Sequence, residues 1–301
     1  MLLLTACPAH TIPASIRGSI LRTSTPPMLP LSFEFFPPKT AEQRDSLHHS
    51  AERLKTHAPE YVSCTFGAGG STLSYTYDTV VALKAQGLDV APHLSCMGGT
   101  REEIRELLQR YVDMGCRRIV ALRGDMPSGM AVAGEFRHAI DLVRFIRSEF
   151  DGHFHIEVAG YPEFHPQARN ADDDLRHLVE KVAAGANGVI TQYFFNAEAY
   201  QRFVRDVRAL GIQVPIVPGI MPISNFSQLK RFSDLCGAEI PRWIERRMIS
   251  YGDDVESVRE LGTDVVADLC SRLIEIGAPA LHFYTLNRAK STIAVIERIR
   301  G

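Results

Sequence analysis

The chain has 301 residues, enough to bury a large core in one α/β domain or in two smaller ones. Hydrophobic residues make up 45% and charged residues 23% of the sequence, an ordinary composition for a soluble globular protein. The formal net charge of −2 argues against a nucleic-acid-binding surface or a basic membrane-binding face. No run of 18 apolar residues predicts a membrane-spanning helix.

The N-terminal segment and the cysteines bear on the compartment. Residues 1–30 contain Arg17 and Arg22, no acidic residue, and many Ser, Thr and Pro. An organellar transit peptide has this composition, but so does a poorly ordered tail, and we expect the tail. The six cysteines are scattered without a CxxC pair, which indicates a reducing, cytoplasmic compartment and no disulfide framework.

From residue 31 onward, short apolar runs alternate with longer periodic ones. The short runs are rich in β-branched and aromatic residues, and most are apolar at successive positions, as is typical of parallel strands buried on both faces. We expect eight strands, at residues 31–36, 61–68, 90–96, 117–124, 153–161, 188–195, 213–221 and 280–286.

Helical patterns fill the intervals between these strands. One helix is expected to begin at Thr100, which forms a capping box with Glu103, and others end at Gly185 or Gly188 and at Gly211. The interval before the last strand is longer and supplies an extra helix in "IPRWIERRMISYGDD". This order predicts a (β/α)₈ TIM barrel over residues 31–301, with a doubly wound open sheet as the alternative.

In a (β/α)₈ barrel the active site lies at the C-terminal ends of the strands, here called the rim. Polar residues occur at this position on at least six of the eight expected strands. Chance could place a few polar residues there, but this many favours an enzyme over a binding or scaffold protein. They are Glu34, Thr65, His93, Arg123, Asp125, Tyr161, Glu163, His165, Gln192, Asn287 and Arg288.

Glu34 is the most unusual of these, because it follows Phe33 and precedes Phe35, Phe36 and two prolines. A strand position that faces solvent would explain it without any chemistry. The apolar neighbours weaken that explanation, since an apolar setting disfavours an ionised carboxylate and suits a general acid near neutral pH. By strand alternation, Phe33 and Phe35 should pack outward while Glu34 faces the barrel axis.

Three other segments each allow two interpretations. "ALRGDMP" is either a strand end that turns at Gly124 with Asp125 as a cap, or a loop that holds a phosphate or a flavin. Asp172–Asp174 suggest metal ligands, but acidic residues also favour the first turn of a helix, so we predict no metal site. Gln192 is either a satisfied core amide or a group that reads the edge of a heterocycle.

Taken together, eight segments resemble the methylenetetrahydrofolate reductases, flavin-dependent enzymes of one-carbon metabolism. They occur in the family's order and span residues 32–288, so the resemblance covers the whole expected barrel. A single segment is a modest signal, whereas eight in order are highly specific. The segments are "FEFFPPK", "VSCTFGAGG", "APHLSC", "IVALRGD", "YPEFHP", "GANGVITQYFF", "PGIMPISNF" and "HFYTLNR".

The resemblance implies a (β/α)₈ barrel that binds FAD noncovalently at the rim. NADH or NADPH reduces the flavin and leaves, and 5,10-methylenetetrahydrofolate then enters, takes the hydride and becomes 5-methyltetrahydrofolate, a step on the route to methionine. It also implies a homo-oligomer, a tetramer or a dimer. The short form looks bacterial, and we expect no regulatory S-adenosylmethionine domain. NADH and NADPH are not distinguished by the residues.

The resemblance also assigns roles to residues. Glu34 matches the general acid and Asp125 the acid beside the flavin. Gln192 matches a pterin contact, Phe226 a ring-stacking residue and Arg288 a folate-binding arginine. The family often has an amide and a base where this chain has His177 and Glu180, so that contact is not carried over. Positions that match FAD contacts are Thr65, His93, Leu122, Arg123, Gly124, Asp125, Tyr161, His165, Asp174 and Lys181.

Two other functional classes use the same rim. One is a non-redox barrel enzyme, such as a pterin- or folate-binding methyltransferase or an aldolase. No Lys except Lys39 lies at a strand end, which disfavours a Schiff-base aldolase. The other class is a non-catalytic folate carrier, in which Glu34 would be dispensable.

Overall fold

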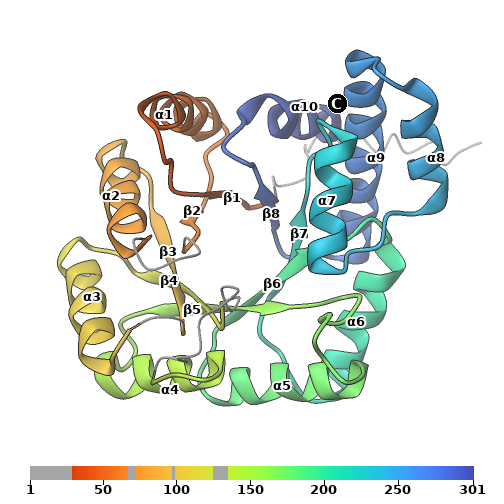
Figure 1. The fold of residues 1–301 in the computed structure, drawn as a ribbon. Coiled ribbons are helices and arrows are strands. Elements are labelled where there is room, and N and C mark those ends of the chain that lie inside the picture. Colours follow the sequence, from red (N-terminus) through yellow and green to blue (C-terminus); the bar gives the residue numbers. More distant parts are fainter. Residues whose placement is uncertain (1–28, 67–71, 97–98, 125–134) are drawn as a thin grey trace, which may run out of the picture.

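The computed structural model describes residues 29–66, 72–96, 99–124 and 135–301 (Figure 1). Eight parallel strands form a closed barrel in sequence order, in which the first strand pairs with the last. Helices surround the barrel on the outside, as seen along its axis in Figure 1. The strands are β1 (Leu31–Phe35), β2 (Tyr61–Cys64), β3 (Val90–Ser95), β4 (Arg118–Leu122), β5 (His155–Gly160), β6 (Gly188–Tyr193), β7 (Ile216–Ile220) and β8 (Leu281–Tyr284). The predicted TIM barrel is confirmed.

The helices occupy the expected intervals. They are α1 (Ala41–Lys55), α2 (Thr72–Ala85), α3 (Arg101–Asp113), α4 (Ala139–Phe150), α5 (Ala171–Ala183), α6 (Ala197–Ala209), α7 (Phe226–Cys236), α8 (Arg242–Tyr251), α9 (Val255–Ile276) and α10 (Ala289–Arg300). The extra helix predicted before the last strand is α8. Within the described part of the chain, no helix is long and apolar enough to cross a membrane.

Local sequence signals explain several helix boundaries. The predicted capping box is present, since the Thr100 hydroxyl accepts from the Glu103 N–H at 3.2 Å and the Glu103 carboxylate accepts from the Thr100 N–H at 2.7 Å. Asp172–Asp174 occupy the first turn of α5, where the helix dipole favours acidic residues. No cluster of metal-ligating side chains occurs among the described residues.

Because side chains alternate along a strand, β1 sends some outward against the helices and others into the barrel. Phe33 and Phe35 are fully buried in the large apolar core that includes the surrounding helices, and the ring centroid of Phe33 lies 6.1 Å from that of Phe283. Glu34 faces the other way, into the barrel, as alternation predicts. A separate small apolar cluster contains Tyr61, Ala91, Val120 and Ile190.

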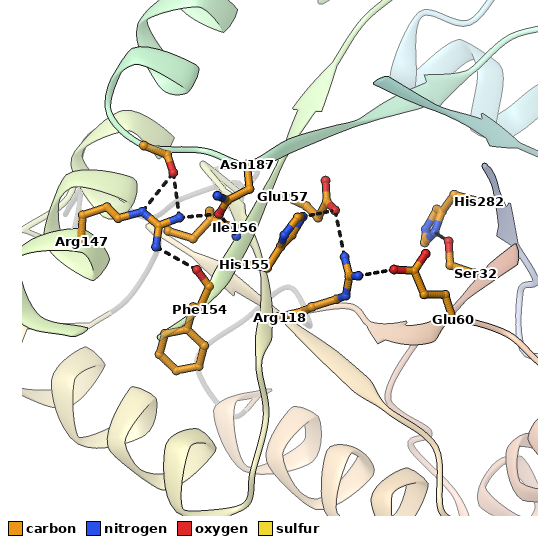
Figure 2. A network of polar contacts seen from close by, with 11 residues as sticks. Ser32, Glu60, Arg118, Arg147, Phe154, His155, Ile156, Glu157, Asn187 and His282 are labelled. Carbon is orange, nitrogen blue, oxygen red and sulfur yellow. Dashed lines mark hydrogen bonds and ion pairs between the residues drawn. The ribbon is translucent and has the colours of Figure 1, made fainter. Parts of the chain in front are cut away.

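An ion cluster surrounds the buried carboxylate of Glu157, toward the N-terminal ends of the strands (Figure 2). Glu157 is 4% exposed, and its Oε1 lies 3.0 Å from His155 Nε2 and 3.5 Å from Arg118 Nη1. Arg118 also pairs with Glu60. A Cβ at position 188 would lie 2.3 Å from Glu157 Oε2, so only glycine leaves room for this carboxylate. Arg118 and His155 begin β4 and β5, and Glu60 precedes β2, so the cluster gathers where strands start rather than at the rim, which indicates a structural role.

A second arginine joins loops at the same end of the barrel. Figure 2 shows Arg147, whose guanidinium donates to the carbonyl of Gly185 at 2.8 and 3.0 Å and to that of Phe154 at 2.8 Å. Its bonds to carbonyls fix the loops that precede β5 and β6, since an arginine presents several donors in a rigid plane.

Candidate active site

The Glu34 carboxylate lies between two imidazoles at the rim. Its Oε2 is 3.4 Å from His93 Nε2, on β3, and 3.6 Å from His282 Nε2, on β8. The Glu34 side chain is 18% exposed, whereas the His93 and His282 side chains are 6% and 0% exposed. Three strands therefore bring one carboxylate and two rings together, and the carboxylate remains accessible to a ligand.

The expected apolar setting of the Glu34 carboxyl is wrong. Its apolar sequence neighbours, Phe33 and Phe35, point into the outer core, while the carboxyl faces His93 and His282. Adjacent residues of a strand point to opposite faces, so the neighbours in sequence do not form the surroundings of the side chain. The inward direction of Glu34 was predicted correctly, but its chemical environment was not.

His282 is held from its other side by a second polar group. Its Nδ1 shares a hydrogen bond of 2.7 Å with the hydroxyl of Ser32, two residues before Glu34 on the same face of β1. Apart from their approach to Glu34, neither the Nε2 of His282 nor that of His93 has a hydrogen-bond partner among the described residues. Both ring nitrogens are therefore available to the carboxylate, or to a proton that it gains or loses.

Burial lowers the pKa of His93 to about 4, although the Glu34 carboxylate raises it and His282 lowers it further. An imidazole with this pKa is uncharged at neutral pH. Glu34 therefore lies beside an imidazole, that of His93, which is neutral at neutral pH.

Tyr284 covers His282 on the rim side of β8. The two rings are nearly perpendicular, with centroids 5.4 Å apart. The Tyr284 hydroxyl donates to the carbonyl of Thr191 at 2.7 Å, across an irregularity in the pairing of β6 and β7. A Cβ at position 219 would lie 2.6 Å from the Tyr284 ring and 2.2 Å from the Thr191 carbonyl oxygen, so Gly219 provides the space for this crossing. Tyr284 is thus fixed as a wall of the site.

A second group of predicted residues meets beyond β5. The rings of Tyr161 and His165 lie edge to face, with centroids 4.6 Å apart, and Asp174 accepts from the His165 N–H at 2.9 Å. Lys181 Nζ donates to the carbonyl of Ala159 at 2.6 Å. Burial lowers the pKa of Lys181 to about 8, opposed by the Asp174 carboxylate.

The remaining predicted residues have varied surroundings. Arg123 donates to the Gln167 amide, Gly124 has a φ of +79°, and Gln192 accepts from the N–H of Tyr193 at 3.0 Å. Of the other predicted residues, Thr65 follows β2, Leu122 ends β4, Phe226 begins α7 and Arg288 caps α10. Asp125 lies outside the described residues.

Sequence reasoning missed Ser32, His282 and Tyr284. The available signal was alternation, because "SFE" and "HFY" each place polar or phenolic groups two residues apart, with a phenylalanine between them on the opposite face. Pairing of β1 with β8 then brings the two runs side by side, with Ser32 opposite His282 and Glu34 opposite Tyr284. Barrel closure was predicted and implies that β1 pairs with β8, but it does not fix which residues lie opposite each other.

Known proteins resemble the chain over most of its length. The family model for methylenetetrahydrofolate reductase matches residues 24–300. Proteins described as 5,10-methylenetetrahydrofolate reductase from Salmonella typhimurium (strain LT2) and Escherichia coli (strain K12) are each 42% identical over 266 residues, 88% of this chain and of the relative. A probable methylenetetrahydrofolate reductase (NADH) from Oryza sativa subsp. japonica is 38% identical over 88% of this chain and 47% of its own length.

Solved structures agree on the fold. An uncharacterized protein from Clostridium thermocellum that binds two copies of 5-methyl-5,6,7,8-tetrahydrofolic acid superposes with a TM-score of 0.64 at 18% identity, covering 90% of this chain and 94% of the other. At this identity the likeness supports the barrel alone. The family match and the 42% identity carry the assignment, and the chain belongs to the methylenetetrahydrofolate reductase family.

Proposed function

We propose that the protein reduces 5,10-methylenetetrahydrofolate to 5-methyltetrahydrofolate with NADH or NADPH, using FAD. The observation that carries this proposal is the partly exposed Glu34 carboxylate, held between His93 and His282 at the rim of a barrel of this family. The reaction consumes one hydride and one proton per turnover, so a site for it needs a group that delivers a proton.

The donor set fits FAD, which combines a flat ring system with two phosphates. Lys181 and Arg123 supply positive charge for the phosphates, since the pKa of Lys181 is about 8 and an arginine is always charged. Tyr161 and His165 form an aromatic pair beside them. We assign FAD binding to Thr65, His93, Leu122, Arg123, Gly124, Asp125, Tyr161, His165, Asp174 and Lys181.

FAD, when bound, supplies the hydride that the folate receives and is itself reduced by the nicotinamide. The protein's task is then to bind both ligands and to handle the proton. Glu34 donates its carboxyl proton to N10 of the folate as the bond between N10 and the methylene carbon breaks. The resulting iminium at N5 accepts the hydride at the methylene carbon, which gives the methyl product.

Ser32 sets the tautomer that His282 presents to Glu34. With the Ser32 hydroxyl accepting from Nδ1, the Nε2 of His282 is an acceptor that faces Glu34. With the hydroxyl donating to Nδ1, the Nε2 carries a proton that faces the carboxylate at 3.6 Å. The tautomer therefore decides whether His282 presents a donor or an acceptor to Glu34, while the proton itself returns to the carboxyl, which is 18% exposed, from water after the product leaves.

Folate is held by residues from three other elements. Gln192 reads the pterin edge, Phe226 stacks on a ring and Arg288 pairs with a carboxylate of the substrate, while Asp125 favours the developing cation. We further propose a homo-oligomer, a dimer or a tetramer, in a reducing cytoplasmic compartment. The five described cysteines are all unpaired, which supports that compartment.

Anaerobic spectroscopy tests the proposal. The purified protein, supplied with FAD, is expected to show flavin absorbance that bleaches on addition of NADH or NADPH. The colour should return on addition of 5,10-methylenetetrahydrofolate, with formation of 5-methyltetrahydrofolate. A protein that binds no FAD would contradict the proposal, as would one whose reduced flavin is not reoxidised by the folate.

A further inference from the structure

The end of β1 is held by one side chain from the far end of the chain. The Asn287 amide oxygen accepts from the Phe36 N–H at 2.9 Å, and its NH₂ group donates to the Phe36 carbonyl at 2.8 Å. Asn287 is 6% exposed, and its own carbonyl accepts from the Ser50 hydroxyl of α1 at 2.9 Å. Buried bonds of this kind gain from the low local dielectric and are costly to break.

These bonds replace a strand ladder that cannot continue. The pairing of β1 with β8 ends at Glu34 and Tyr284, and Phe36 is followed by Pro37 and Pro38, which have no N–H to donate. A side-chain amide carries the same donor and acceptor pair as a peptide group, so Asn287 acts as one more rung. The Asn287 side chain therefore continues the hydrogen bonding to β1 beyond Glu34, where its backbone pairing with β8 ends.

The next bonds in the same turn reach Glu34 itself. The Thr285 hydroxyl donates to the Glu34 carbonyl at 2.6 Å, and the Thr285 N–H donates to the same oxygen at 3.3 Å. The Asn287 N–H in turn donates to the Thr285 hydroxyl at 3.1 Å. The backbone is thus held at Glu34 and again two residues later, at Phe36.

The turn has an unusual backbone. Leu286 and Asn287 have φ values of +51° and +57°, in the left-handed region that non-glycine residues rarely adopt. Asparagine tolerates this region better than most residues, and it also supplies the amide. After the turn the chain enters α10 through Arg288, whose N–H donates to the Thr285 carbonyl at 2.9 Å. This turn therefore connects Thr285, which bonds to the Glu34 backbone, with Arg288, the N-cap residue of α10.

We propose that Asn287 is a positioning residue: its amide clasps the backbone of Phe36, and this clasp sets the place of the Glu34 carboxyl relative to His93, His282 and Arg288. The inference rests on the proposed function, in which Glu34 and Arg288 act on the same folate. His93 and His282 lie on other strands, so a small shift of β1 changes both distances to Glu34.

The test uses Asn287→Gly in the complete FAD-bound protein. Glycine suits the positive φ, so this change deletes the clasp without adding backbone strain. Asn196→Gly is the matched control, because Asn196 caps α6 by accepting from the Glu198 N–H and has no part in the site. Two quantities are measured for each variant: hydrogen exchange at the Phe36 amide by NMR, and the rates of the two half-reactions by stopped-flow absorbance.

Asn287→Gly is expected to accelerate exchange at the Phe36 amide and to leave flavin reduction by NAD(P)H unchanged. It should slow the folate half-reaction at saturating folate about tenfold to a hundredfold, the scale expected for a catalytic group displaced by about 1 Å. Asn196→Gly is expected to change none of these.

Three results would overturn the inference. They are an unchanged Phe36 exchange rate, an unchanged folate half-reaction despite faster exchange, and equal losses in both half-reactions, which would indicate general damage. A wild-type protein that does not reduce folate would instead overturn the proposed function, and the Phe36 exchange rate would still report whether the clasp exists.

Discussion

Acid pH should destabilise the fold through His93. Burial lowers the pKa of His93 to about 4 from an ordinary 6.5, with the Glu34 carboxylate raising it and His282 lowering it. Below pH 6.5 the unfolded chain takes up a proton on this ring, whereas the folded protein does not until about pH 4. Stability is therefore complete above pH 6.5 and is lost as pH falls toward 4. The difference of about 2.5 units corresponds to about 3 kcal/mol in total, and about 2 kcal/mol at pH 5.

NMR of ¹³C-labelled histidine rings measures this directly, and His93→Gln identifies the resonance. The His93 ring is expected to stay neutral down to about pH 4. In urea unfolding, the wild type should lose about 2 kcal/mol more than His93→Gln between pH 7 and pH 5. A His93 ring that titrates near 6.5, or equal losses in the two proteins, would refute the claim that burial keeps this imidazole uncharged.

Three further outcomes follow from single contacts. Gly188→Ala places a Cβ against the fixed Glu157 carboxylate and should cost about 1–3 kcal/mol in thermal unfolding; an unchanged Tm would contradict that fixed placement. FAD affinity should fall as pH rises through about 8 in the wild type but not in Lys181→Arg, and parallel pH profiles would exclude Lys181 as a phosphate ligand. Ser32→Ala removes the bond to His282 and should slow folate reduction about tenfold, whereas a wild-type rate would exclude a role for Ser32 in setting the His282 tautomer.

The fold was predictable because every signal agreed. Strands at intervals of one βα unit, the capping box at Thr100 and the glycines after helices all indicated a (β/α)₈ barrel, and all are present. The observed strands are shorter than the predicted runs. β1, for example, ends at Phe35, because Phe36 bonds to the Asn287 side chain rather than to a neighbouring strand.

The site was only partly predictable. Alternation correctly turned Glu34 inward, but the carboxyl's partners come from β3 and β8, 59 and 248 residues away in the chain, and only the register shows their approach. The same holds for Asn287, which was placed at the rim but whose amide clasp on Phe36 depends on the left-handed turn at Leu286 and Asn287. Such contacts depend on the register between strands that are distant in the sequence, which the periodicity of a single strand does not encode.

The central claim is that Glu34 delivers the proton while other residues bind FAD. The most direct test is Glu34→Gln, which keeps the size of the side chain and removes the proton donor. We expect flavin reduction by NAD(P)H to proceed at the wild-type rate and reoxidation by 5,10-methylenetetrahydrofolate to fall by a factor of about 10² to 10⁴, as stopped-flow absorbance would show. Reoxidation at the wild-type rate would contradict the assignment of Glu34 as the acid.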